Sequence, residues 1–218
     1  MHVRFFLDYI SSNAYLAWAA LRPIAKRYGA TVEPVPVLFA GLLEAHGQLG
    51  PAEVPAKGLW MWKNNLRKAR LLGIELNQPA YHPFNPLLAL RASSLPMSDE
   101  QRTRLVGALL TAVWVDGLHV SEPAVVERVA TSVGLDGARI VADAAATEAK
   151  GRLRAQTEAA IAAGVFGVPS MLVGEELFWG YDDLPYMEHL LAGNDPIAGV
   201  AIPTVAPRAS AARRRLRS

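Results

Sequence analysis

The sequence predicts one small α/β domain with an all-helical domain inserted into its middle. Residues 2–37 show the hydrophobic pattern of a strand, a helix and a second strand, and residues 169–191 show two short strands and a helix. Roughly 110 residues of mainly helical pattern separate these two halves. Because a stable sheet needs three or more strands, the two halves are expected to share one sheet.

The N-terminal half is a predicted βαβ unit. Residues 2–8 (HVRFFLD) form an aromatic and β-branched run typical of a strand buried on both faces. Residues 13–28 have apolar side chains at helical spacing, and Gly29 is expected to end this helix. Residues 31–37 return to a strand pattern, whose two prolines favour an edge strand or the end of a strand. The two strands should be parallel, with a right-handed crossover.

The middle of the chain begins with a predicted loop over residues 38–55, which is rich in Gly and Pro. In the helix that follows, the predicted apolar face is Leu59, Trp62, Leu66 and Ala69, and the predicted solvated face is Lys63, Asn64, Arg67 and Lys68. Further helices are predicted over residues 87–95, 99–116, 121–133 with Ser121 as N-cap, 136–146 with Asp136 as N-cap, and 148–163.

The C-terminal half returns to β structure. Two short apolar runs, 169–173 and 177–179, lie around Gly174-Glu175-Glu176 and predict a hairpin. Asp182 or Asp183 is expected to cap a final helix through Leu191. The predicted domains are therefore residues 1–56 plus 165–200, a helical insertion over 57–164, and a basic, disordered tail over 201–218.

The composition excludes several classes of function. The chain of 218 residues has no cysteine, which rules out disulfides, Cys-ligated metals and a cysteine nucleophile. The five histidines show no metal-ligand spacing, so no metal is assigned. The net charge of +2 comes mainly from five arginines in the last eleven positions, which argues against a nucleic-acid partner. No apolar run approaches the roughly 18 residues of a membrane span, and no signal-peptide pattern is present, so a cytoplasmic protein is expected.

Ser11 lies at the joint between the first strand and the first helix. One interpretation is structural, because serine is a preferred N-cap. The other is chemical, because a hydroxyl and free N–H groups at a positive helix end can hold an anion or a thiolate. The chain has no thiol of its own, so a thiolate at this joint would have to arrive with a ligand.

Several motifs resemble one known family. Val168-Pro169 before a hairpin resembles the cis-proline loop of the thioredoxin fold, and the helical insertion resembles the DsbA branch of that fold. Ser11-Ser12-Asn13-Ala14 stands where that branch has Cys-x-x-Cys, which excludes disulfide exchange. Serine at the first position is similar to the pattern of the kappa-class glutathione transferases and of the 2-hydroxychromene-2-carboxylate isomerases.

The resemblance to the isomerases covers nearly all of residues 3–192 and implies a thioredoxin-like fold with an inserted all-helical domain. The motifs that carry it are Asp8-Tyr9-Ile10-Ser11, Ala14-Tyr15-Leu16-Ala17, Lys57-Gly58-Leu59, Phe84-Asn85-Pro86, Ala89-Leu90-Arg91, the run from Gly164 to Ser170, and Gly180-Tyr181-Asp182.

The resemblance also implies a glutathione site. Ser11 would donate a hydrogen bond to the glutathione thiolate, and the Val168-Pro169 loop, with a cis bond, would pair with the cysteinyl backbone. Lys57 would contact the glycine carboxylate, and Gln48 stands where an amide contact is expected. Without the resemblance, Val168-Pro169 is also explained as a turn and Lys57 as a solvated lysine.

The resemblance assigns the γ-glutamyl end of glutathione to the motif Gly180-Tyr181-Asp182. Asp182 would hold the ammonium group, although a capping role for this aspartate is the alternative. Tyr181 departs from the small polar residue usual in the family, and Asp183 departs from the common arginine. Asn85 and Arg91 are assigned to the substrate, since an arginine can pair with a carboxylate through two hydrogen bonds.

The resulting hypothesis is a glutathione-dependent isomerase of a small aromatic carboxylate in aromatic-compound breakdown. A kappa-like glutathione transferase and a non-catalytic, peptide-binding thioredoxin-fold protein are the alternatives. The resemblance also suggests a homodimer, for which the sequence shows no periodic surface stripe.

Overall fold

The computed structural model describes residues 1–203. It contains a four-stranded mixed sheet, to which the N-terminal and the C-terminal parts of the chain contribute two strands each. Its strands are β1 (His2–Leu7), β2 (Thr31–Pro36), β3 (Ser170–Val173) and β4 (Glu176–Trp179), in the order β2-β1-β3-β4. β1 pairs with β2 in parallel and with β3 antiparallel, and β3 and β4 form a hairpin. The expected sharing of one sheet and the edge position of β2 are confirmed. The part of the predicted tail from residue 204 on lies outside the described residues.

The two faces of the sheet carry separate cores. Val3, Phe5 and Leu7 pack on the face covered by α1 (Ser12–Arg27), where the ring of Phe5 lies 5.5 Å from that of Trp18. Phe6, on the opposite face, belongs to a smaller cluster with residues of α2 (Phe39–His46) and α8 (Thr147–Ala162). This alternation follows from the two-residue period of a strand.

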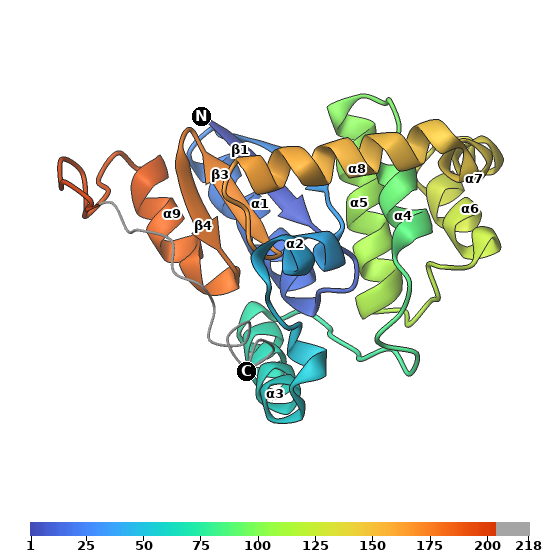
Figure 1. Cartoon of the computed structure of the whole chain (residues 1–218), viewed down its shortest axis with the longest axis horizontal. Helices are drawn as coiled ribbons and strands as arrows, with labels where there is room; N and C mark the ends of the chain where they lie inside the picture. Colours follow the sequence, from blue (N-terminus) through green and yellow to red (C-terminus); the bar gives the residue numbers. More distant parts are fainter. Residues whose placement is uncertain (204–218) are drawn as a thin grey trace, which may run out of the picture.

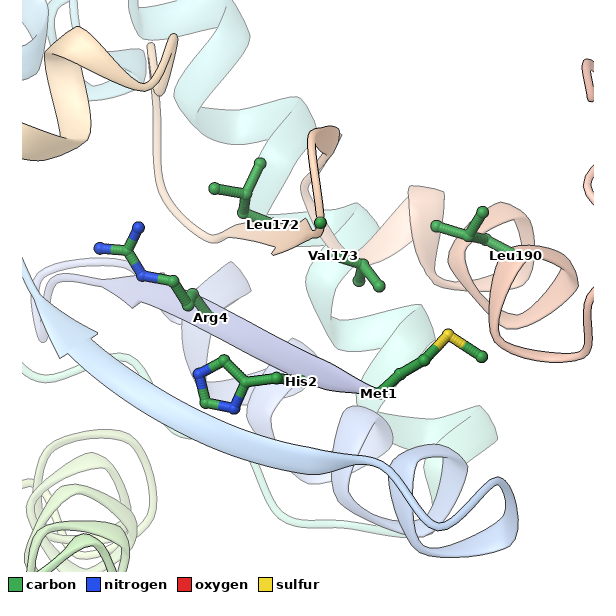
Figure 2. Close-up of a pocket in the computed structure, with 7 residues that line it drawn as sticks. Met1, His2, Arg4, Leu172, Val173 and Leu190 are labelled. Atoms are coloured by element: carbon green, nitrogen blue, oxygen red, sulfur yellow. The ribbon is translucent and has the colours of Figure 1, made fainter.

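The first half of β1 departs from the prediction of a strand buried on both faces. His2 is exposed and Arg4 half-exposed, and both line an open cavity together with Leu172, Val173 and Leu190 (Figure 2). The reason is that α2 and α8 cover only the part of the second face around Phe6.

The remaining helices form the connection between β2 and β3. They are α3 (Pro55–Leu72), α4 (Leu87–Ser93), α5 (Asp99–Trp114), α6 (Pro123–Ser132) and α7 (Gly137–Ala145), and α9 (Leu184–Leu191) follows the hairpin. In Figure 1, α4 to α7 gather beside the sheet, α3 lies apart from them, and α8 runs from α7 back to the sheet. Because α8 contacts β2 as well as α4, the boundaries at 57 and 164 stay a prediction. Within residues 1–203, no helix is both long and apolar enough to cross a membrane.

The predicted loop over residues 38–55 is wrong in its first part, which forms α2. No side chain of α2 or of its N-cap residue Leu38 caps the helix. Instead the Phe39 N–H donates to Asp8 Oδ2 at 2.9 Å, so that the capping carboxylate comes from the end of β1. A local sequence pattern cannot reveal a cap supplied from 31 residues away.

The prediction of Ser121 as an N-cap is wrong, whereas the prediction for the last helix is right in the N-cap position but not in the capping bond. The N-cap of α6 is Glu122, with Pro123 at the first helical position, and the Ser121 hydroxyl donates to the Asn85 carbonyl instead. At α9 the N-cap position is Asp183, whose carboxylate makes no capping bond but accepts from the Trp179 N–H at 2.8 Å. Asp136 does cap α7, as expected, by accepting from the Arg139 N–H.

Candidate functional site

Ser11 is the N-cap of α1, directly after the turn that ends β1. Its backbone is extended (φ −98°, ψ 109°), and its hydroxyl oxygen accepts a hydrogen bond from the Ala14 N–H at 3.2 Å. The N–H groups of Ser12 and Asn13 come before the first hydrogen bond of the helix and have no partner within it. The capping bond uses a lone pair of the hydroxyl and leaves its proton free to be donated. The structural and the chemical interpretations of Ser11 are therefore compatible.

The residues around Pro169 lie against this joint. Ser11 Oγ lies 3.5 Å from the carbonyl oxygen of Val168, a long and weak hydrogen bond. The Val168–Pro169 peptide bond is cis, and the Pro169 carbonyl accepts from the Gly180 N–H at 2.9 Å. The fold thus brings together Ser11, Val168 and Pro169, and ties them to the segment that carries Tyr181 and Asp182.

Tyr181 and Asp182 begin a short 3₁₀ turn, η2 (Tyr181–Asp183), that packs beside the first turn of α1. The Tyr181 N–H donates to Asn13 Oδ1 at 3.1 Å. Burial and the neighbouring Asp182 carboxylate raise the pKa of the Tyr181 hydroxyl. Asp182 is exposed, and its Oδ2 accepts a hydrogen bond from Lys68 Nζ at 2.6 Å.

The turn between β1 and Ser11 is held by buried hydrogen bonds. Asp8 Oδ1 accepts from the Ile10 N–H at 3.1 Å, in addition to the bond from Phe39. Burial raises the pKa of Asp8 to about 7, although these N–H donors act in the opposite direction. Trp114 Nε1 donates to the Tyr9 carbonyl, and His82 Nε2 lies 3.1 Å from the Ile10 carbonyl. Trp114 of α5 and His82 of the connection between α3 and α4 therefore hold the backbone just before Ser11.

The open cavity in Figure 2 lies at the other end of β1. It is formed around His2 and Arg4, whereas Ser11 follows the carboxyl end of the strand. At about 3.3 Å per residue, the two ends of β1 are roughly 17 Å apart. This cavity is therefore separate from the Ser11 joint.

Comparison with known proteins agrees with this geometry. The family model described as a DSBA-like thioredoxin domain matches residues 2–192. A 2-hydroxychromene-2-carboxylate isomerase of Pseudomonas sp. (strain C18) is 31% identical over 196 residues, covering 88% of this chain and 90% of that protein. The chain belongs to the DSBA-like thioredoxin family, in its 2-hydroxychromene-2-carboxylate isomerase group.

Two further comparisons give the similarity of this chain to a solved structure of the isomerase group and to a kappa-class transferase. A solved structure of a 2-hydroxychromene-2-carboxylate isomerase superposes with a TM-score of 0.83 at 29% identity, covering 88% of this chain and 95% of that chain. Glutathione S-transferase kappa 1 of Homo sapiens is 24% identical over 207 residues, covering 87% of this chain and 90% of that protein. The predicted thioredoxin-like fold with helices between its two halves is confirmed.

Four of the predicted site residues make no hydrogen bond to Ser11 within the part of the chain that the structure describes. Lys57 is exposed in the first turn of α3, and Gln48 is exposed just after α2. Asn85 Oδ1 accepts from the Leu87 N–H at the start of α4, and Arg91 lies within α4 with a buried Nε that has no partner there. Their assignments within this isomerase-group site stay predictions.

Lys68 and Asn65 are the residues that sequence reasoning missed. Lys68 is buried, not solvated as predicted, whereas Leu59 of the predicted apolar face is 59% exposed. Asn65 is fully buried, and its Nδ2 donates to Ser12 Oγ at 2.8 Å. The inward face of α3 meets the polar start of α1 and the η2 turn, so it is partly polar itself. The available signal was the three-residue spacing of Asn65 and Lys68, which places both on one helix face.

Proposed function

We propose that this protein is a glutathione-dependent cis-trans isomerase of the 2-hydroxychromene-2-carboxylate type, acting in aromatic-compound breakdown. The observation that carries the proposal is the Ser11 hydroxyl, which caps α1 and faces the Val168 carbonyl. The similarity to proteins named 2-hydroxychromene-2-carboxylate isomerase, over most of the chain, supports the choice of reaction.

The groups around Ser11 fit a thiol-bearing peptide. The hydroxyl and the first turn of α1 suit a thiolate, because a helix N-terminus favours negative charge. The backbone of Val168 suits pairing with an extended peptide. The exposed Asp182 carboxylate suits an ammonium group. Gln48 and Lys57, both exposed, would bind the other end of the peptide.

When bound, glutathione supplies a thiolate that adds reversibly to the conjugated carbon of the ring-opened substrate, so that the former double bond can rotate before elimination. Ser11 would stabilise the ionised sulfur by donating a hydrogen bond from its hydroxyl, because the present bond from that hydroxyl to the Val168 carbonyl is long and weak. A charge-assisted hydrogen bond contributes about 1.5–3 kcal/mol. The end of α1 adds a few tenths to about 1 kcal/mol.

The substrate carboxylate would be bound by Arg91 and oriented with the help of Asn85. The buried Nε of Arg91 makes no hydrogen bond among residues 1–203. A planar guanidinium can bind a carboxylate through two parallel hydrogen bonds.

A glutathione transferase activity is the second candidate, because a kappa-class transferase is among the relatives. One assay separates the two activities. With 2-hydroxychromene-2-carboxylate in large excess over glutathione, an isomerase converts many equivalents of substrate and leaves free thiol unchanged. Loss of one thiol for each product molecule would instead indicate a transferase. Glutathione binding without any conversion would contradict the proposed substrate.

A further inference from the structure

Lys68 is a buried cation whose counter-charge lies at the surface. Its side chain is 7% exposed, whereas that of Asp182 is 68% exposed. Among the described residues, its ammonium makes one hydrogen bond, to Asp182 Oδ2 at 2.6 Å. The Tyr181 ring lies 5.0 Å from Nζ, at the distance of a cation–π contact. Only one of its three N–H donors is therefore used.

This ion pair lies next to the proposed glutathione site. Asn65 and Lys68, three residues apart on α3, contact the Ser12 hydroxyl and the η2 turn respectively. The same turn is fixed to the start of α1 by the bond between Tyr181 N–H and Asn13. Lys68 thus lies one helical turn along α3 from Asn65, which bonds to the residue after Ser11.

The charges at this ion pair restrict which ligands can bind. A ligand ammonium bound to Asp182 Oδ1 would leave two cations sharing one carboxylate, and an uncompensated positive charge beside the buried Lys68 is unfavourable. A ligand that carries a carboxylate beside its ammonium avoids this penalty. Its carboxylate can accept from the two unused Lys68 donors, while its ammonium donates to Asp182 Oδ1, for which no hydrogen bond is present among residues 1–203.

We infer that Lys68 is a specificity-determining residue that binds the α-carboxylate of the γ-glutamyl group, while Asp182 binds its α-ammonium. The inference rests on the proposed glutathione site and adds to it a requirement for an amino-acid zwitterion. Asp183 cannot supply this cation, because it is itself an acid whose carboxylate accepts from the Trp179 N–H. Lys68 would supply it from the adjacent helix.

The test compares two ligands by calorimetry: glutathione and 4-aminobutyryl-cysteinylglycine, which lacks only the α-carboxylate. The wild-type protein should bind glutathione about tenfold or more tightly than this analogue. Lys68→Met should remove that preference by weakening glutathione binding, with binding of the analogue unchanged or tighter. Lys63→Met, at an exposed lysine of the same helix, should keep the wild-type ratio.

The possible outcomes separate the inference from the proposed function. Binding of neither ligand by the wild-type protein would contradict both. Glutathione binding without preference over the analogue would overturn only the role of Lys68. An equal loss of both ligands in Lys68→Met would also overturn it, because that loss indicates a merely structural residue. Lys68→Arg, which keeps the buried charge, should retain the preference, and a folded Lys68→Arg protein without it would count against the inference.

Discussion

The hydroxyl of Ser11 and the carbonyl of Val168, 157 positions apart in the sequence, lie 3.5 Å from each other. The hydroxyl already serves α1 as its N-cap through the Ala14 N–H. A proton held by so long a hydrogen bond can be redirected to a stronger acceptor, such as an anion. The Ser11 hydroxyl therefore caps α1 with its oxygen and keeps a weakly bonded hydrogen that it can donate to a ligand. The proposed thiolate site is based on this combination.

The pH dependence of stability should reveal the buried Asp8. Its pKa is raised in the folded chain from 3.8 to about 7. Between these values the folded chain keeps a proton that the unfolded chain has lost, so the contribution of Asp8 to the free energy of unfolding decreases as pH rises from about 4 to about 7. Asp8→Asn cannot titrate. The free energy of unfolding of the wild type, relative to Asp8→Asn, should therefore fall between pH 5 and pH 7.5.

Chemical denaturation at the two pH values measures this difference. Glu175→Gln, at an exposed position in the β3–β4 turn, is the control and should show no such trend. A wild-type protein that gains stability relative to Asp8→Asn as pH rises would contradict the raised pKa.

Asn65 should contribute to stability through its bond to Ser12. Asn65→Ala leaves the buried Ser12 hydroxyl without its partner, and we expect a loss of about 1–3 kcal/mol in the free energy of unfolding. Asn64→Ala changes the preceding, less buried asparagine and should stay within about 0.5 kcal/mol of the wild type. Urea unfolding measures both. Equal stability of the two variants would show that the Asn65–Ser12 bond contributes little.

Lys57 should act only on the glycine end of glutathione. Because Lys57 is exposed, its charge pair with the glycine carboxylate should contribute about 0.2–1 kcal/mol, which is at most about fivefold in the dissociation constant. Lys57→Met should weaken glutathione binding by that factor and leave γ-glutamylcysteine, which has no glycine, unaffected. Calorimetry with both ligands measures this. Equal weakening of the two ligands would rule out the assigned contact.

The fold could be predicted from the sequence wherever the signal is local. The strand at residues 2–7, the helical spacing of α1 and the hairpin at Gly174 each depend on neighbouring residues, and each is confirmed. The predicted burial of β1 on both faces is not confirmed at His2 and Arg4. The sequence does not predict α2 because the carboxylate that caps it belongs to Asp8, which directly follows β1 and lies 31 residues before Phe39. Residue type alone predicts Ser121 as a cap, but Pro123 starts the helix after Glu122.

The site could be predicted only in part, for a related reason. Ser11, Val168, Pro169, Tyr181 and Asp182 belong to motifs, and the fold places them around the start of α1. Lys68 carries no motif, and a lysine on a helix is normally solvated. Its burial depends on the packing of α3 against η2 and α1, which no periodicity in α3 alone can reveal.

The thiol pKa of bound glutathione tests the central claim most directly. Ultraviolet titration of the thiolate in the complex should give a pKa well below the free value of about 8.5, and Ser11→Ala should raise it by about one to two units. Ser98→Ala removes a comparable N-cap, at the start of α5, and should leave the bound thiol unchanged. The same thiol pKa in wild type and in Ser11→Ala would contradict the account.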